Sequence, residues 1–168
     1  DLEVSEADLN LEFECPPGEW RPIAPPAVGS DPEVVWFVDG VRRVEARVWI
    51  DDGDTDHLGL CASYAAGVVR CDSGGAAVVG IDVRRGLFSA ASTAEPITTA
   101  HGTFEVHMAA ASSPEVLSLA VQERMTLTEI MVATYTRGTE AGLAVVDGPL
   151  RGRQHLTDAI GLIKTHHT

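Results

Sequence analysis

The chain has 168 residues, of which 45% are hydrophobic and 22% charged, a balance typical of one water-soluble globular domain with its own core. Its formal net charge of −13 excludes a uniformly basic surface, so any contact with phosphates must depend on local clusters of arginine. No apolar run approaches the ~20 residues of a membrane-spanning helix, and no basic segment followed by an apolar stretch stands at the start.

The first segment, residues 1–33, is acidic and rich in proline, and this composition predicts an extended arm. Residues 34–168 form the predicted domain. The sequence begins with Asp1 and not with Met, and its last residues read as a strand followed by the first residues of another segment. We therefore expect the natural protein to continue beyond Thr168 and the domain to lack its C-terminal part here.

The three cysteines, Cys15, Cys61 and Cys71, form no Cys-x-x-Cys pair. An odd number without such a pair argues against a disulfide framework and a structural zinc site. Cys61 and Cys71 lie in apolar stretches, where a reduced core thiol is the usual state. We therefore expect a cytoplasmic protein.

Strand-forming residues dominate the first part of the domain, and a Ser/Thr-rich loop follows over residues 89–100. The runs of β-branched and aromatic residues between turn signals predict strands. These predicted strands cover residues 34–39, 41–50, 58–70, 77–88 and 103–108.

One long helix is predicted after these strands. Ser113 suits the N-cap, Pro114 the first turn, and Glu115 complements the positive end of the helix dipole. The pattern predicts a helix that ends near Arg137, where Gly138 and then a second glycine can close it. Further strands are predicted over residues 143–147 and 159–164.

Two apolar runs each end on Asp-Gly, at Asp39 and at Asp147. An unbroken apolar run predicts a strand buried on both faces, which delivers its last residue to the edge of the sheet. If the two strands are neighbours, both carboxylates meet at one point. Two close carboxylates repel each other unless a proton or a cation intervenes, and a divalent metal ion is the usual solution.

Basic residues follow both motifs: Arg42 after Asp39, and Arg151 after Asp147. Lys164, the single lysine of the chain, follows the last predicted strand and would offer a point charge to a phosphate. The pattern therefore indicates metal-dependent chemistry on a phosphate. Each Asp-Gly pair also fits a simple tight turn, and the first could be the corner of a hairpin into the strand at 41–50.

Antiparallel strands, then a long helix, then a strand that ends in Asp is the element order of the ribonuclease H-like fold. We therefore predict an α/β domain with a mixed sheet, one long packing helix and the N-terminal arm. In that architecture the first and fourth strands are parallel neighbours, and their ends carry the acidic site.

The segments FVDGVRR, GLCASYAAGVVRCD, VVDGPLRGR and GLIKTHH resemble the NurA family of DNA-end-processing nucleases, in an actinobacterial-type version, over roughly residues 34–168. The resemblance implies a ribonuclease H-like core that uses Mn²⁺ (or Mg²⁺). It also implies DNA degradation as a 5′–3′ exonuclease and single-strand endonuclease in double-strand-break repair. The implied partners are DNA, a HerA-type hexameric translocase and a second copy of the chain, without a membrane.

By this resemblance Asp39 and Asp147 are metal ligands and a helical glutamate completes the set. Two features depart from the family. Val41 and Pro149 stand where the family has serine after Asp-Gly, so any role of that hydroxyl is lost. A further His or Asp of the family site lies beyond this chain, so we expect the site here to be incomplete.

The helix offers two glutamates, Glu123 and Glu129. At 100° per residue, Glu123 falls inside the predicted buried stripe and Glu129 on the polar side. The rise per residue of the helix and of the following strand places the helical position level with Asp147 midway between the two glutamates. The resemblance favours Glu129, and both remain candidates. The predicted buried stripe consists of Val116, Leu119, Ala120, Leu127, Ile130 and Met131.

The sequence thus predicts a nuclease in which two metal ions bridge the scissile phosphate and water is the nucleophile. Asp39 would be the shared ligand, and Arg42, Arg151 or Lys164 would hold the DNA backbone. Two alternatives stay open: a non-catalytic module that docks the translocase, and a nucleotide-binding domain of the actin and sugar-kinase type. The length leaves no room for the second fold copy that the kinase type requires.

Overall fold

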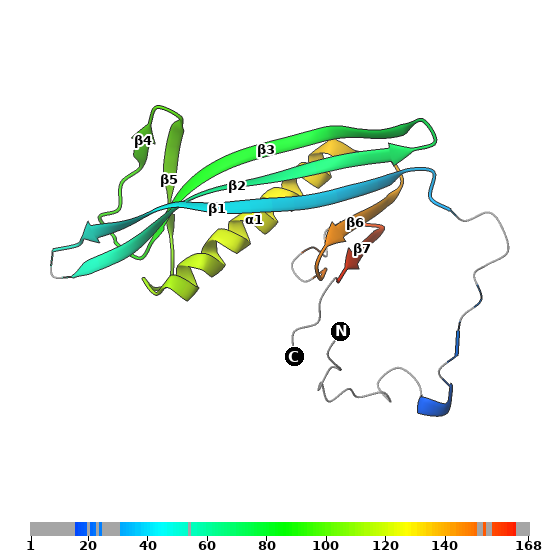
Figure 1. The fold of residues 1–168 in the computed structure, drawn as a ribbon, viewed down its shortest axis with the longest axis horizontal. Helices are drawn as coiled ribbons and strands as arrows, with labels where there is room; N and C mark the ends of the chain where they lie inside the picture. The colour runs from blue at the N-terminus through cyan, green and yellow to red at the C-terminus, as the bar shows by residue number, and fades with distance from the viewer. Residues whose placement is uncertain are drawn as a thin grey trace, which may run out of the picture.

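The structure is a computed structural model that describes residues 16–19, 21–22, 24, 31–53, 55–150, 153 and 156–163. Figure 1 shows a long, twisted sheet with a single long helix against it. The elements are η1 (Pro17–Glu19), β1 (Val35–Asp51), β2 (Asp56–Asp72), β3 (Gly75–Ser89), β4 (Ile97–Thr99), β5 (Gly102–Met108), α1 (Pro114–Arg137), β6 (Leu143–Asp147) and β7 (Ala159–Leu162).

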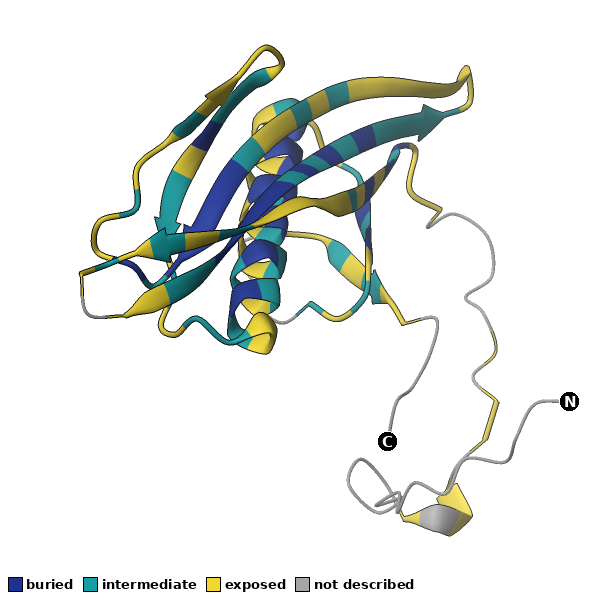
Figure 2. Ribbon diagram, turned by 60° about the vertical axis from the view of Figure 1, so that its left-hand side comes forward, coloured by how far each residue is buried: buried dark blue, intermediate teal, exposed yellow. Residues whose placement is uncertain are grey.

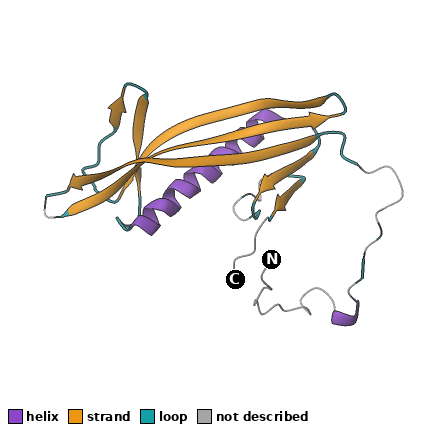
Figure 3. Ribbon diagram, in the orientation of Figure 1, coloured by secondary structure: helices purple, strands orange, loops and turns teal. Residues whose placement is uncertain are grey.

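The seven strands form one mixed sheet in the order β4-β5-β3-β2-β1-β6-β7. The long strands β1, β2 and β3 are antiparallel to one another. The pairs β1–β6, β6–β7 and β3–β5 are parallel. The chain is thus a mixed α/β domain, in which α1 covers one face of the sheet (Figure 3).

β1 is one continuous strand of 17 residues. It pairs with β2 from Val35 opposite Cys71 to Asp51 opposite Asp56. The hairpin corner considered at Asp39-Gly40 is therefore wrong: the turn comes after Asp51, whose Oδ1 accepts the N–H of Gly53 at 2.9 Å. The reason is that β2 supplies ladder partners on both sides of the Asp-Gly pair, so the glycine lies in extended backbone.

The predicted helix is confirmed with its boundaries. The Ser113 hydroxyl accepts the N–H of Val116 at 3.3 Å, and the N–H of Gly138 donates to the Thr134 carbonyl at 3.1 Å. The N-cap serine and the closing glycine satisfy backbone groups that a helix end leaves without partners. α1 lies across β1, β2 and β3, and no helix in the described part of the chain has the length and apolarity that a membrane crossing requires.

The face that α1 buries differs from the prediction. The side chains against the sheet include Leu117, Val121 and Met125, whereas Leu119 and Leu127 are more than half exposed. The sheet-facing stripe also contains Thr128, Glu129 and Arg137, each of which makes at least one side-chain hydrogen bond. A helical wheel based on hydrophobicity assigns such polar residues to the exposed side of the helix. The predicted buried stripe was therefore placed on the wrong side of α1.

The prediction that the first Asp-Gly strand is buried on both faces is also wrong. Trp36 and Val38 are 2% exposed under the helix, but Phe37 between them is 46% exposed. Figure 2 shows exposed residues along much of β1 and β3. On the face opposite α1, Cys61 and Leu87 are buried with Phe104 of β5, and Ala94 and Ile97 pack against them. Both Cys61 and Cys71 are free thiols.

The corrected helix face can be tested with two leucines two positions apart. Leu117→Ala removes a side chain with no exposed surface and should cost about 2–5 kcal/mol of unfolding free energy. Leu119→Ala, at a position 58% exposed, should change it by no more than about 0.5 kcal/mol. Urea unfolding followed by circular dichroism measures both, and equal losses would contradict this placement of the helix.

Candidate active site

Asp39 and Asp147 lie side by side on neighbouring parallel strands. The register runs from Val35 opposite Leu143 to Val38 opposite Val146, and the two aspartates are the next residue on each strand. β6 ends at Asp147, while β1 continues past Asp39. The juxtaposition that the sequence predicted is therefore present, although Asp39 lies within its strand and not at the strand end.

The backbone after each aspartate is fixed by its glycine. The N–H of Gly40 donates to Oδ1 of Asp39 at 2.8 Å. Gly148 has φ +85°, a conformation that disfavours other residues, and its N–H donates to the Leu162 carbonyl at 2.9 Å. The second Asp-Gly thus ends β6 in a turn that β7 holds in place.

Glu129 is the third carboxylate of the site. It projects from the sheet-facing side of α1, is 3% exposed, and its Oε1 lies directly against Gly40. A Cβ at position 40 would overlap this carboxylate, so the absence of a side chain there allows the close approach. The helix therefore brings an acid to the two aspartates of the sheet.

The three carboxylates line one cavity of about 420 Å³. Apolar and amide side chains from the helix close one side, and the turn after β6 closes another. The lining residues are Asp39, Gly40, Gln122, Met125, Glu129, Asp147, Gly148, Pro149, Arg153 and Ile163.

Arg153 is the site residue that sequence reasoning missed. It is 7% exposed; its Nη2 donates to Oε2 of Glu129 and its Nη1 to the Pro149 carbonyl at 2.9 Å. Its Nε is buried without a protein partner among the described residues. The sequence pattern instead favoured Arg151, two positions earlier. No local signal pointed to this contact, because the helical pattern placed Glu129 on the polar side, where a carboxylate needs no buried cation.

The electrostatics of Glu129 reflect its burial. Loss of water around the carboxyl raises its pKa, and the negative charges of Asp39 and Asp147 raise it further. The hydrogen bond and charge of Arg153 act in the opposite direction, but the net pKa lies above the usual range of a glutamate. A cation placed between the three acids would favour the ionised form of Glu129.

The donor types at the site suit a divalent metal ion, because carboxylate oxygens are hard ligands. In the present arrangement, however, no group of three or more His, Cys, Asp or Glu side chains in the described residues is placed to hold a metal ion. One oxygen of Glu129 is engaged by Arg153. A cation at this site would therefore share Glu129 with the guanidinium or displace it.

The other predicted site residues divide into two groups. Glu123 is exposed and does not line the cavity, because the sheet-facing stripe of α1 runs through Met125 and Glu129. Arg42 is exposed and donates to the Ser118 hydroxyl at 3.2 Å, one turn of α1 away from Gln122. Arg151 and Lys164 lie outside the described residues.

Neither a protein-family model nor a curated protein sequence matches the chain. The case for a function therefore depends on the carboxylates and the arginine at the β1–β6 junction.

The raised pKa of Glu129 predicts a pH dependence of stability. A folded-state pKa above the unfolded value means that the stabilising contribution is present at low pH and lost as the pH rises through the raised pKa. The unfolding free energy of the wild type should therefore fall relative to Glu129→Gln as the pH rises from about 4.5.

Thermal melts over this pH range measure the difference. Glu123→Gln, which changes an exposed carboxylate on the same helix, is the matched control and should follow the wild type. A wild type that gains stability over Glu129→Gln as the pH rises would contradict the described environment of Glu129.

Proposed function

We propose that this chain is the core of a metal-dependent DNA nuclease with a ribonuclease H-like fold. The observation that carries the proposal is the convergence of Asp39, Asp147 and Glu129 on one cavity, from two parallel strands and a helix. Three acids at one point are costly unless cations neutralise them. Phosphodiester hydrolysis is a chemistry for which such carboxylate-bound cations are used.

The topology supports the proposed fold. Three antiparallel strands precede a long helix, and the next strand, β6, adds in parallel beside the first. This is the order expected for a ribonuclease H-like core, in which acids on these two neighbouring strands and the intervening helix form the site.

Each residue has a role in the proposal. Asp39 would be the shared ligand of Mn²⁺ or Mg²⁺, and Asp147 and Glu129 would complete the ligand shells. When bound, the ions would lower the pKa of a water molecule and neutralise charge on the phosphate. Arg153 positions the Glu129 carboxylate, while Arg42 would contact the DNA backbone near the start of α1. Arg151 and Lys164 remain proposed phosphate contacts.

The resemblance extends the proposal to biology: 5′–3′ exonuclease and single-strand endonuclease action on DNA ends in double-strand-break repair, in the cytoplasm, together with a HerA-type hexameric translocase. One observation favours the second candidate, a non-catalytic module that docks the translocase. Arg153 already supplies a positive charge to Glu129, as expected where a protein replaces a metal ion by its own side chain. Metal-dependent cleavage separates the two candidates.

The nuclease proposal predicts that Asp39→Asn and Asp147→Asn in the complete protein lower Mn²⁺-dependent degradation of single-stranded DNA by at least about a hundredfold. Each change removes the charge that binds the cation but keeps the size of the side chain. Binding of DNA should persist, because arginines and lysine supply the contacts to phosphate. Release of labelled nucleotides and fluorescence anisotropy measure the two effects, and wild-type cleavage by both variants would refute the proposal.

The two helical glutamates should behave differently in the same assay. Glu129→Gln should lower the cleavage rate by about a hundredfold or more, because it removes a carboxylate from the cavity. Glu123→Gln should retain the wild-type rate, because its side chain points to solvent. Full activity of Glu129→Gln would remove this residue from the proposed ligand set.

A further inference from the structure

Arg153 combines burial with an unused hydrogen-bond donor. The residue is 7% exposed, and its Nε–H is buried without a partner among the described residues. Its two other nitrogen atoms are engaged: Nη1 donates to the Pro149 carbonyl at 2.9 Å, and Nη2 donates to Oε2 of Glu129. A buried donor without an acceptor is unfavourable, so the Nε–H favours a ligand that brings a further acceptor oxygen.

The Nε and Nη2 atoms of Arg153 form one edge of the guanidinium. The two N–H groups on such an edge are parallel and match two oxygens of a carboxylate or a phosphate. Glu129 uses only half of this edge, because its other oxygen, Oε1, lies against Gly40 of β1. The edge therefore suits an anion that presents two oxygens at once.

The guanidinium is held at the cavity by contacts that do not involve Glu129. Besides the Nη1 contact, the main-chain N–H of Arg153 donates to the Leu150 carbonyl at 2.8 Å, and its carbonyl accepts the N–H of Leu156 at 3.0 Å. Arg153 is the only basic residue among the described residues that line the cavity. The cavity volume of about 420 Å³ is many times the roughly 30 Å³ that one water molecule occupies in the liquid, so a phosphate group can enter.

Arg137 is the other arginine in the described part of the chain whose buried Nε lacks a partner. Both of its Nη atoms donate to main-chain carbonyls, those of Thr157 and Gly142, at 3.0 and 2.9 Å. These contacts connect the end of α1 to the loops that follow it. Arg153 differs because one of its contacts is to a carboxylate, which another anion can replace.

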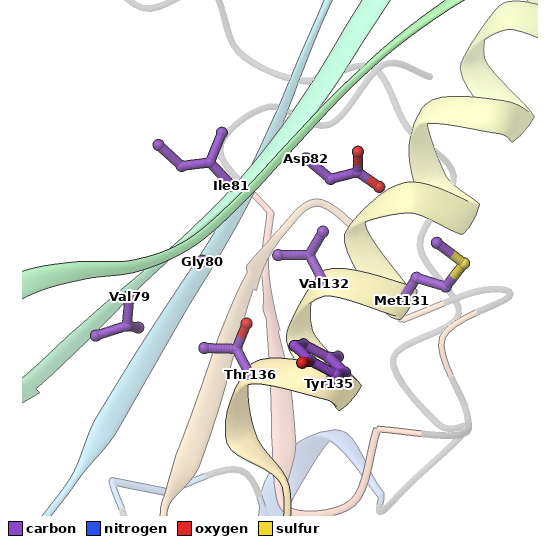
Figure 4. A pocket seen from close by; sticks show the side chains of 8 residues that line it. All are labelled: Val79, Gly80, Ile81, Asp82, Met131, Val132, Tyr135 and Thr136. Carbon is purple, nitrogen blue, oxygen red and sulfur yellow. The ribbon is translucent and has the colours of Figure 1, made fainter.

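The larger cavity between α1 and β3 has no comparable cation among its described lining residues. Its volume is about 570 Å³, and Figure 4 shows Val132 and Thr136 of the helix pointing toward β3 across it. Its only charged lining residue in the described part of the chain is Asp82, which is paired with Arg84 at 2.8 Å. A phosphate there would meet mainly apolar side chains, so the acidic cavity is the better site for an anion.

We propose that Arg153 binds the phosphate group of a phosphodiester substrate, and that the Glu129 carboxylate occupies this anion position in the free protein. When a cation takes over Glu129, the whole Nε–Nη2 edge becomes available to two phosphate oxygens. The proposal rests on the proposed nuclease function, since it names the residue that would hold the phosphate beside Asp39 and Asp147. Arg153 is then more than the buried counter-ion of a glutamate.

Phosphate binding in the absence of metal tests this role independently of catalysis. In the complete protein, Asp39→Asn, Asp147→Asn and Glu129→Gln together replace the three carboxylates by amides and keep the positive charge of Arg153. This triple variant should bind inorganic phosphate and the dinucleotide TpT at least about tenfold more tightly than the wild type, because the carboxylates no longer repel the anion or occupy the guanidinium. Titration calorimetry measures both affinities.

Two additions to the triple variant identify the group that binds the phosphate. Arg153→Gln should abolish the binding, whereas Arg43→Gln, which removes an exposed arginine of β1, should leave it unchanged. A triple variant that binds neither ligand, or whose binding survives Arg153→Gln, would overturn the proposal. Binding of inorganic phosphate without TpT would overturn the assignment to a phosphodiester.

The affinity for Mn²⁺ gives a second measurement that needs one substitution. Because Arg153 competes with a cation for Glu129, Arg153→Gln should bind Mn²⁺ about threefold or more tightly than the wild type, while its KM for single-stranded DNA rises at least about tenfold. Weaker Mn²⁺ binding by Arg153→Gln would mean that Arg153 only positions Glu129, and would overturn the proposal while the nuclease function stands. A wild type that binds no Mn²⁺ would instead refute the nuclease function and, with it, this role of Arg153.

Discussion

The parallel pairing of β1 with β6 is the constraint on which the candidate site depends. Because Val38 lies opposite Val146, Asp39 and Asp147 are forced into adjacent positions at the point where β6 ends. The repulsion between them must be offset by a charge from elsewhere in the fold. Such a charge can reach the two aspartates because β6 ends at Asp147 while β1 continues, which leaves the junction of the two strands open on one side.

The helix completes the site by burying a carboxylate, an arrangement that is unfavourable unless a positive charge compensates it. A glutamate 3% exposed next to two aspartates has a raised pKa, and one buried arginine, Arg153, reaches it from the loop after β6. Removing either partner of a buried pair leaves an uncompensated charge. Gly40 allows the carboxylate to approach the strand. The strand, helix and loop are thereby tied to one another at the cavity.

Local signals in the sequence predicted the elements well and the tertiary environment poorly. Ser113 and Gly138 fixed the ends of α1, because caps are set by short-range hydrogen bonds. The helix stripe was wrong because Glu129 is buried by contacts with Gly40 and Arg153, which are distant in sequence. Asp39 was predicted at a strand end because the residues next to it in sequence do not indicate that β2 pairs with β1 on both sides of it. Pairing across the sheet is the information that a local pattern lacks.

Whether the three carboxylates form a metal site can be measured by Mn²⁺ binding to the complete protein, followed by electron paramagnetic resonance of the free ion. We expect the wild type to remove Mn²⁺ from solution and Asp39→Asn, Asp147→Asn and Glu129→Gln each to lose most of this binding, while Glu123→Gln binds as the wild type does. Binding that is equal in all five proteins, or absent from the wild type, would contradict the claim that these three carboxylates form a metal site.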